Sequence, residues 1–186
     1  MFIETEITPN PETLKFLPGI AVLPAQSAQF DDADSASVSP LATMLFDVEG
    51  VIRVYLGADF ITLTKQESLD WIDLKPLVLS AIMQFYTTGQ PVLSEGISLS
   101  VSDAPNDENV DPQIVEQIKA LLEEKIRPAV AQDGGDIVYQ GFKDGIVYLQ
   151  MQGACAGCPS ATMTLKNGVE NLLKYYVPEV VGVAQV

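Results

Sequence analysis

The two cysteines of the chain, Cys155 and Cys158, are its most chemically distinctive residues. They form a CxxC pair in the run GACAGCPSA, whose small residues leave room for backbone amides to approach a charged sulfur centre. Pro159 suits the first turn of a helix, which predicts that Cys158 lies at or just before a helix start. The helix dipole there favours the thiolate, the form that binds metal or attacks a disulfide.

The number of available ligands restricts the metal chemistry. Thiolate sets indicate zinc, copper(I) or iron–sulfur clusters, and tetrahedral zinc and the common clusters take four protein ligands. The chain has 2 cysteines and 0 histidines. A four-thiolate centre therefore requires two chains that each contribute Cys155 and Cys158. Such a shared site is easier to dismantle than a buried cage, which suits a protein that hands its metal centre on.

The CxxC pair has three other interpretations. A thioredoxin-like dithiol also follows a strand at a helix start, but that domain needs further sheet and helix and a proline facing the thiols. Only 10 residues follow Tyr176, and Pro178 is the sole later proline. A zinc ion shared by two chains would use the same ligands. A disulfide or an inert buried pair is the simplest alternative.

The DGGD run, 133–136, is the other candidate feature near the cysteines. Asp133 and Asp136 could support a metal ligand or bind a hard metal ion, but the run is first of all a turn, in which Gly134 and Gly135 provide backbone freedom. The sequence contains no phosphate-binding loop and no HExxH motif, and without histidine it lacks the usual general base. We therefore expect that the protein is not an enzyme.

The order of elements predicts an α+β protein made of two small α/β domains joined by a flexible linker. In the first domain, 1–88, the alternation of Ile3, Thr5 and Ile7 predicts a strand, and TPNPET predicts a turn. SPLATMLF predicts a helix with Ser39 as its cap, and VIRVYLG with DFITLTK predicts a hairpin. A second helix is expected from a cap at Ser68 to Gly89.

Residues 89–110 are rich in proline, serine and acidic residues and predict the linker. The second domain, 111–186, has the predicted order helix, strand, strand, helix, strand. Its first helix starts with Asp111 and Pro112 and is expected to end near Pro128. The two strands IVYQGF and GIVYLQM are joined by KDG, and the CxxC loop directly follows the second of them.

Charge and hydropathy exclude several partners. The formal net charge is −15, which opposes binding to nucleic acid or to an anionic membrane surface. No apolar run approaches the ~20 residues of a membrane-spanning helix. The first residues, MFIETEITPN, resemble neither a secretion signal nor a transit peptide. These features predict a bacterial cytoplasmic protein, with the mature form of an organellar protein as the alternative.

Longer runs resemble a known family. GACAGCPSATMTLKNGVENLL, preceded by RPAVAQDGGDIVY, closely resembles the C-terminal domain of NifU-like (Nfu-type) iron–sulfur cluster scaffold and carrier proteins. TPNPETLKFLPG, SPLATMLF and GVIRVYLGADFITLTK resemble the Nfu N-terminal domain. The resemblance implies an iron–sulfur cluster, usually [4Fe–4S] with [2Fe–2S] as a variant, that Cys155 and Cys158 of two protomers hold and that is transferred to apo-proteins.

The resemblance also implies partners. A homodimer or higher oligomer is expected when the cluster is bound, and apo iron–sulfur clients and cluster-assembly proteins are the expected heterologous partners. The N-terminal domain has no ligand cluster of its own, so we expect it to recognise clients or assembly proteins.

Overall fold

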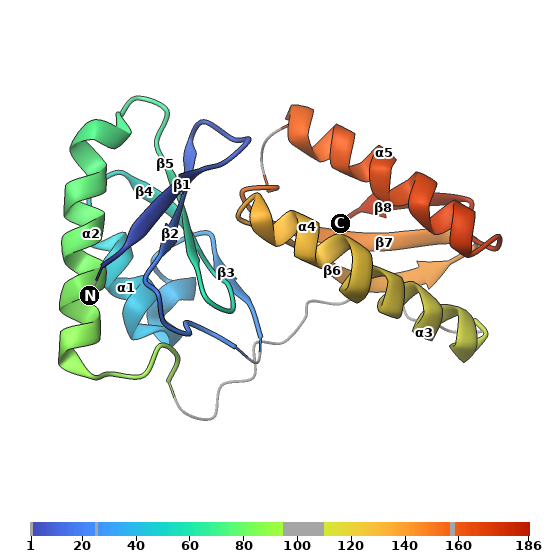
Figure 1. The fold of residues 1–186 in the computed structure, drawn as a ribbon, viewed down its shortest axis with the longest axis horizontal. Helices are drawn as coiled ribbons and strands as arrows, with labels where there is room; N and C mark the ends of the chain where they lie inside the picture. The colour runs from blue at the N-terminus through green and yellow to red at the C-terminus, as the bar shows by residue number, and fades with distance from the viewer. Residues whose placement is uncertain (1, 25, 95–109, 157–158) are drawn as a thin grey trace. The chain divides into compact units, whose positions relative to one another are not determined.

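The computed structural model describes residues 2–24, 26–94, 110–156 and 159–186. The chain divides into two compact units, Met1–Leu99 and Ser100–Val186. Each unit has its own β-sheet (Figure 1). Each also has its own hydrophobic core. The predicted α+β class with two small domains is thereby confirmed. The predicted linker, 89–110, falls mostly outside the described residues, and the predicted domain boundaries stay a prediction.

The first unit is a five-stranded antiparallel sheet with its two α-helices on one face (Figure 1). The strand order is β1-β2-β5-β4-β3, so β1 and β3 form the sheet edges. The elements of this unit are β1 (Glu4–Ile7), β2 (Thr13–Leu17), β3 (Ala28–Phe30), the short 3₁₀-helix η1 (Ser35–Val38), α1 (Pro40–Phe46), β4 (Val51–Leu56), β5 (Ile61–Lys65) and α2 (Trp71–Thr88).

The predicted helix starts of this unit are right for α1 and displaced for α2. The Ser39 hydroxyl accepts a hydrogen bond from the Ala42 amide at 3.1 Å, as expected of an N-cap. For α2 the cap position is Asp70 rather than Ser68, because the Leu69 amide donates to the Gln66 carbonyl and keeps this stretch in a turn. The end of α2 is as predicted, with Gly89 at a left-handed φ of 68°.

Two strands of the first unit, β2 and β3, were not predicted. All of β2 except its last residue is buried, so its sequence TLKFL lacks the alternation of a half-exposed strand. Lys15 is only 7% exposed, because its ammonium group forms an ion pair with Glu6 at 2.9 Å and lies over the Phe60 ring, 4.9 Å from the centroid. β3 has only three residues, which is too short for a periodic signal.

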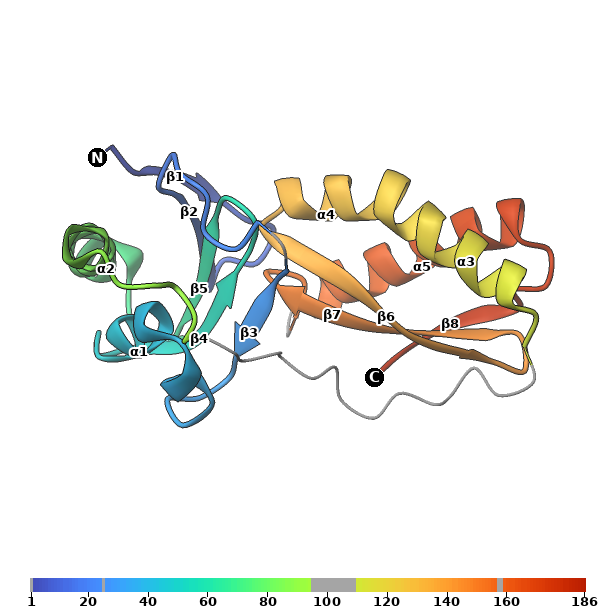
Figure 2. The same ribbon diagram turned by 90° about the horizontal axis from the view of Figure 1, so that it is seen from below.

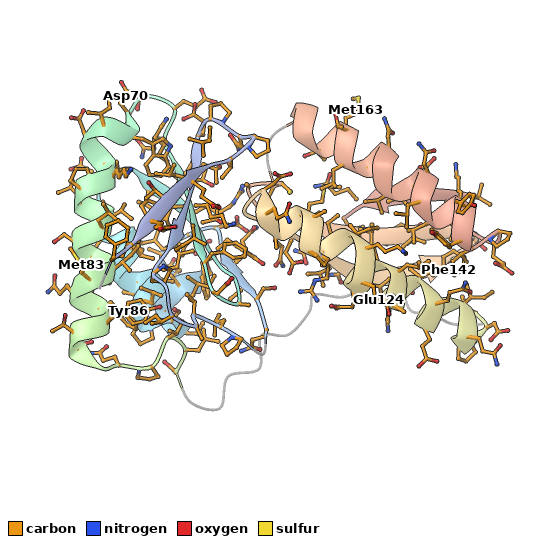
Figure 3. All side chains as sticks on the ribbon, in the orientation of Figure 1. Asp70, Met83, Tyr86, Glu124, Phe142 and Met163 are labelled. Carbon is orange, nitrogen blue, oxygen red and sulfur yellow. The ribbon has the colours of Figure 1, made fainter. Side chains whose placement is uncertain are left out.

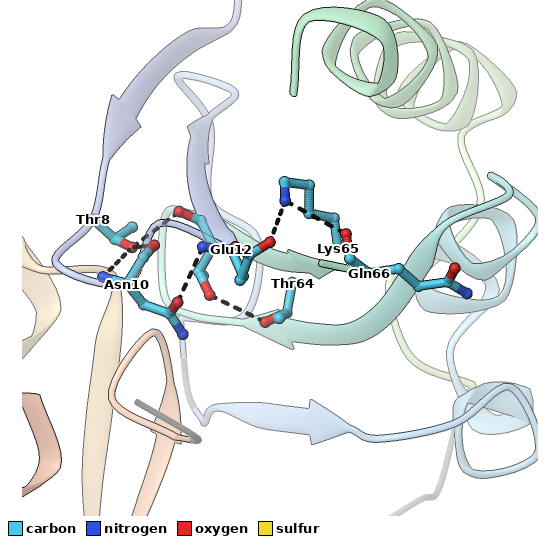
Figure 4. Close-up of polar contacts among 7 residues, drawn as sticks. Thr8, Asn10, Glu12, Thr64, Lys65 and Gln66 are labelled. Carbon is cyan, nitrogen blue, oxygen red and sulfur yellow. Dashed lines mark hydrogen bonds and ion pairs between the residues drawn. The ribbon is translucent and has the colours of Figure 1, made fainter. Parts of the chain in front are cut away.

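The predicted TPNPET turn joins β1 to β2, and side chains hold it together (Figure 4). The Thr8 hydroxyl donates to the Asn10 carbonyl at 2.8 Å, and the Asn10 side chain accepts from the Glu12 amide at 3.0 Å. The Glu12 carboxylate then forms an ion pair with Lys65 at the end of β5. The turn therefore fixes β1, β2 and β5 to one another.

The second unit is a three-stranded sheet with its helices on one face (Figure 2). β6 and β7 are antiparallel, and β8 is parallel to β7, so the connection between β7 and β8 must cross over the sheet. The observed order confirms the predicted helix, strand, strand, helix, strand. The elements are α3 (Pro112–Leu121), the π-helix η2 (Leu122–Ile126), α4 (Arg127–Gln132), β6 (Gly135–Lys143), β7 (Ile146–Gly153), α5 (Pro159–Tyr176) and β8 (Gly182–Gln185).

Two local signals of the second unit act as predicted. The Asp111 side chain accepts a hydrogen bond from the Gln113 amide at 2.9 Å and caps α3, with Pro112 in its first turn. Asp144 and Gly145 both have positive φ, 51° and 78°, as a two-residue hairpin turn between β6 and β7 requires.

The first helix of this unit does not end near Pro128 as predicted. It continues to Gln132 through η2, in which the Arg127 amide donates to the Leu122 carbonyl, five residues back. Pro128 has no amide hydrogen and its ring would clash with the carbonyl of residue 124 in a regular α-helix, and the wider turn accommodates it. The spacing of the buried residues also agrees with a wider turn. The buried residues Ile118, Leu122, Ile126 and Val130 recur at every fourth position.

The helix α5 covers the sheet with one side and exposes the other. Val169 and Leu173 are buried in the core of the second unit. Met163, on the side of α5 away from the sheet, is 65% exposed (Figure 3). The Glu170 carboxylate links α5 to the last strand, since it accepts from the Val183 amide at 3.1 Å and from the Lys174 ammonium at 2.6 Å.

Candidate metal centre

Of the two predicted ligands, the structure describes Cys155. It lies two residues after β7 ends at Gly153, and it is only 6% exposed within the core of the second unit. Cys158 lies outside the described residues, and α5 begins directly after it at Pro159. The order strand, CxxC loop, helix is therefore as predicted, while the assignment of both cysteines as metal ligands stays a prediction.

Glycines bring the DGGD turn against the thiol loop. Gly134 and Gly153 have left-handed φ values of 77° and 64°, which residues with side chains rarely adopt. The Ala154 amide donates to the Gly134 carbonyl at 3.1 Å, and Gly135 pairs with Gly153 in the β6–β7 ladder. The hairpin thus places residues that are about twenty positions apart in sequence in direct contact.

The sulfur of Cys155 packs closely against Gly135. A β-carbon built on Gly135 would lie 2.4 Å from the Cys155 Sγ atom and 2.9 Å from the Gln152 carbonyl oxygen. Both distances are shorter than any van der Waals contact. Backbone freedom therefore explains Gly134, but Gly135 is required because only hydrogen fits beneath the thiol. This corrects the role that the sequence suggested for the second glycine.

The carboxylates of the DGGD run are arranged differently from each other. Asp133 is exposed at the end of α4. Asp136 is 5% exposed and accepts two hydrogen bonds from Arg127, Nε to Oδ1 at 2.8 Å and Nη2 to Oδ2 at 2.7 Å. The Asp136 oxygens are thus engaged by a cation. Across the part of the chain that is described, no three histidine, cysteine, aspartate or glutamate side chains gather as a metal site.

Sequence reasoning missed two residues that support the site. The Thr162 hydroxyl, in the first turns of α5, donates to the Cys155 carbonyl at 3.0 Å. Arg127 also donates to Glu123, one helical turn before it. The hydrogen bonds from Arg127 to Asp136, and secondarily those to Glu123, raise the pKa of the guanidinium above its usual range. Arg127 is therefore a permanent cation held on Asp136, the residue after Gly135.

The donor set suits a thiophilic metal centre. Thiolates bind soft metal ions and iron–sulfur clusters, and the two cysteines per chain, set among small residues, are half of a four-thiolate shell. The residues present therefore fit a sulfur-bound iron cluster or zinc. They do not fit a hard metal ion, since the adjacent carboxylate is occupied by Arg127.

Comparison with known proteins assigns the family. Residues 118–184 match the NifU-like domain, and residues 3–89 match the N-terminal domain described as scaffold protein Nfu/NifU. The whole chain aligns at 49% identity with the human NFU1 iron-sulfur cluster scaffold homolog, mitochondrial, and covers 72% of it. The chain belongs to the Nfu/NifU family of iron–sulfur cluster scaffold proteins.

Two further curated relatives match over the whole chain. NifU-like protein 4, mitochondrial, of Arabidopsis thaliana is 49% identical with 66% of its length covered, and the Drosophila ananassae NFU1 homolog is 50% identical with 64% covered. The chain thus spans about two thirds of the length of these curated relatives. A NifU-like protein of Saccharomyces cerevisiae, solved in solution, is 28% identical with a TM-score of 0.46, over 51% of this chain and 86% of that one.

The predicted bacterial cytoplasmic location is wrong. The relatives at 49–50% identity are named as mitochondrial proteins, which points to an organellar location. Charge and hydropathy could not reveal this, because the folded part of an organellar protein resembles a cytoplasmic protein in composition. None of the helices that the structure describes is both long and apolar enough to span a membrane.

Proposed function

We propose that the protein binds an iron–sulfur cluster, [4Fe–4S] in the first place and [2Fe–2S] as a variant, between two protomers and transfers it to apo-proteins. Cys155 and Cys158 of each protomer are the proposed ligands. The cluster is cargo rather than a resident cofactor, and the protein is a scaffold or carrier rather than an enzyme. The family to which the chain belongs supports the scaffold role.

The observation that carries this proposal is the close contact between the Cys155 sulfur and Gly135. This sulfur is held against Gly135 at a distance that excludes even a methyl group, and the Cys155 carbonyl is bonded to α5. A thiol whose position is fixed in this way is pre-organised for ligation. Two thiols per chain satisfy only half of the four ligands that a cluster takes, so a second protomer completes the shell.

Two rivals use the same thiols. A zinc ion between two protomers needs the same four sulfurs, and a thioredoxin-like dithiol needs no metal. The three possibilities differ in what each protomer pair contains: iron with acid-labile sulfide, zinc, or neither.

The experiment is anaerobic reconstitution of the full chain with iron and sulfide. Broad visible absorption, iron and acid-labile sulfide in the ratio of a cluster, and a dimer mass in solution are the expected results. Mössbauer spectroscopy of the same sample distinguishes [4Fe–4S] from [2Fe–2S]. A colourless protein that binds zinc instead, or a strictly monomeric holo form with all ligands from one chain, would contradict the proposal.

The matched variants are Cys155→Ser and Cys158→Ser. Each removes one thiol per protomer, so each should abolish both the visible absorption and the cluster-dependent dimer. Transfer is tested separately, by mixing the holo form with an apo iron–sulfur enzyme and following the recovery of that enzyme's activity in the presence of a chelator.

For the domain organisation we propose an N-terminal recognition domain at 1–88, a flexible linker at 89–110 and a cluster-binding domain at 111–186. The first unit has 13 acidic and 4 basic residues up to residue 102, and three of these cations are already paired with carboxylates, which leaves an acidic surface for clients or assembly proteins. Deletion of 1–88 should keep cluster binding and change transfer to particular clients. Equal transfer to every client would reject this role.

A further inference from the structure

The ion pair between the half-buried Arg127 and the buried Asp136 is a charged cluster of the second unit that the proposed ligand set does not use. Asp136 follows Gly135 directly in β6, and its carboxylate receives both hydrogen bonds of the Arg127 fork, at 2.8 and 2.7 Å. It also accepts from the Ile137 amide at 2.8 Å. Three donors thus fix this carboxylate.

The helix geometry aims Arg127 at this carboxylate. Arg127 is the first residue after the π-turn η2, where one extra residue is accommodated per turn. In a regular α-helix each residue advances about 100°, and a wide turn advances less per residue, so if the same residues were wound as a regular α-helix the Arg127 side chain would emerge about 100° around the helix. Wide turns of this kind cost helix hydrogen-bond geometry and are frequently found at functional sites.

The chain of contacts from Arg127 to the thiol is short. Arg127 holds Asp136, Asp136 is covalently joined to Gly135, and Gly135 lies beneath the Cys155 sulfur. If β6 moved away from β7 at this point, the contact between Gly135 and the Cys155 sulfur would be lost. A residue that pins β6 at Asp136 therefore controls the position of the thiol without touching it.

We propose that Arg127 and Asp136 are positioning residues for the cluster ligand Cys155: the fork holds the start of β6 in place, so that Gly135 keeps the sulfur in the orientation that a cluster shared by two protomers requires. This inference rests on the proposed function for its biological meaning. Its structural content concerns the apo chain and can be tested there.

The test measures how fast Cys155 reacts with iodoacetamide in the full-length apo protein, with Cys158→Ser as the background so that one thiol remains. Asp136→Asn removes a negative charge, and Arg127→Gln removes a positive charge. Both break the fork and should raise the alkylation rate about tenfold, the factor that corresponds to losing one charge-assisted hydrogen bond. Glu123→Gln removes the other partner of Arg127 and should change the rate less than about twofold.

Asp136→Asn and Arg127→Gln change the charge in opposite directions. The comparison therefore separates an effect on the position of the thiol from an electrostatic effect on its reactivity. If the pair acted on the thiol only through its field, the two rates would move in opposite directions, since one variant removes a negative and the other a positive charge. Opposite shifts, or unchanged rates in both variants, overturn the proposal. So does a rise that merely follows the globally unfolded fraction, measured from the dependence of the rate on urea.

Two further variants cover the remaining outcomes. Arg127→Lys keeps the charge but loses the two-pronged hydrogen bond, and its alkylation rate should lie between those of wild type and Arg127→Gln. It also serves as the test if Arg127→Gln does not fold.

With both cysteines present, the reconstituted Asp136→Asn variant should release its iron to a chelator faster than the Glu123→Gln control. If the wild-type protein takes up no iron, the proposed function fails, while the alkylation rates still decide the positioning role.

Discussion

Gly135 and Cys155 are in contact across the start of the β6–β7 hairpin, and the space between them admits no β-carbon, which would lie 2.4 Å from the sulfur. Gly135→Ala must therefore displace either the thiol or the backbone. We expect a loss of about 1–3 kcal/mol in the free energy of unfolding, the usual cost of overpacking, together with a loss of cluster uptake. Urea unfolding and the iron content after reconstitution measure the two effects. Normal stability together with normal iron uptake would contradict the prediction, because the chain would then accommodate the added methyl group without loss of free energy.

Gly168 provides the matched control, because it lies within α5 and a β-carbon there would meet no atom within 4 Å. Gly168→Ala should raise the free energy of unfolding by about 0.5–1 kcal/mol, since alanine loses less backbone entropy in a helix. The same urea titration checks this. A decrease would mean that the α5 backbone departs from helical geometry at this residue.

Glu170 makes stability depend on pH. Hydrogen bonds from Lys174, and then from the Val183 amide, lower the pKa of Glu170 below its ordinary value of 4.5. A lowered folded-state pKa adds stability above about pH 4.5 that is lost as the pH falls through the folded-state value. Glu170→Gln should therefore be less stable than wild type at pH 7, and this difference should shrink as the solution is acidified. Unfolding curves at several pH values measure it, and a difference that is independent of pH would contradict the assignment.

Lys65 is buried at the end of β5, and its ammonium group depends on Glu12. Glu12→Gln removes the negative charge that pairs with the Lys65 ammonium group. The Gln66 carbonyl, which accepts a hydrogen bond from Lys65 at 3.4 Å, is a weak replacement for it. The free energy of unfolding of the first unit should fall by about 1–3 kcal/mol. Glu67→Gln, at an exposed position near the same strand, is the control and should have little effect. Amide hydrogen exchange assigns the change to the first unit if protection falls in β2 and β5 and stays constant in β6 and β7.

The elements that could be predicted are those with local signals. Ser39 followed by proline, the Asp144–Gly145 turn and the Asp111 cap each determine their own backbone through the next few residues, and the structure agrees at all three. Sequence order also placed the CxxC loop between a strand and a helix. The ligand role of the cysteines is untested by the structure.

The rest depended on contacts between residues far apart in sequence. β2 escaped prediction because Lys15 is buried by an ion pair and a ring that no local pattern reveals. The role of Gly135 follows from the hairpin register, which could have suggested that DGGD and the thiol loop are neighbours but not that a sulfur fills the space. The helix that continues past Pro128 did leave a trace, the strict four-residue spacing of Ile118, Leu122, Ile126 and Val130, which drifts by about 40° per step in a regular α-helix.

The π-turn at Leu122–Ile126 has a consequence for how sequences of this family can vary in length. A π-turn holds one more residue than the α-helical turn it replaces, so removal of a single residue from this segment would convert it to ordinary α-helix and keep the faces of α3 and α4 in the same relative orientation. Winding the same residues as α-helix without a deletion would instead rotate α4 relative to α3 by about 100°, and either the packing of α3 on the sheet or the hydrogen bonds from Arg127 to Asp136 would be lost. A one-residue deletion should therefore be tolerated better in this segment than elsewhere in the helix.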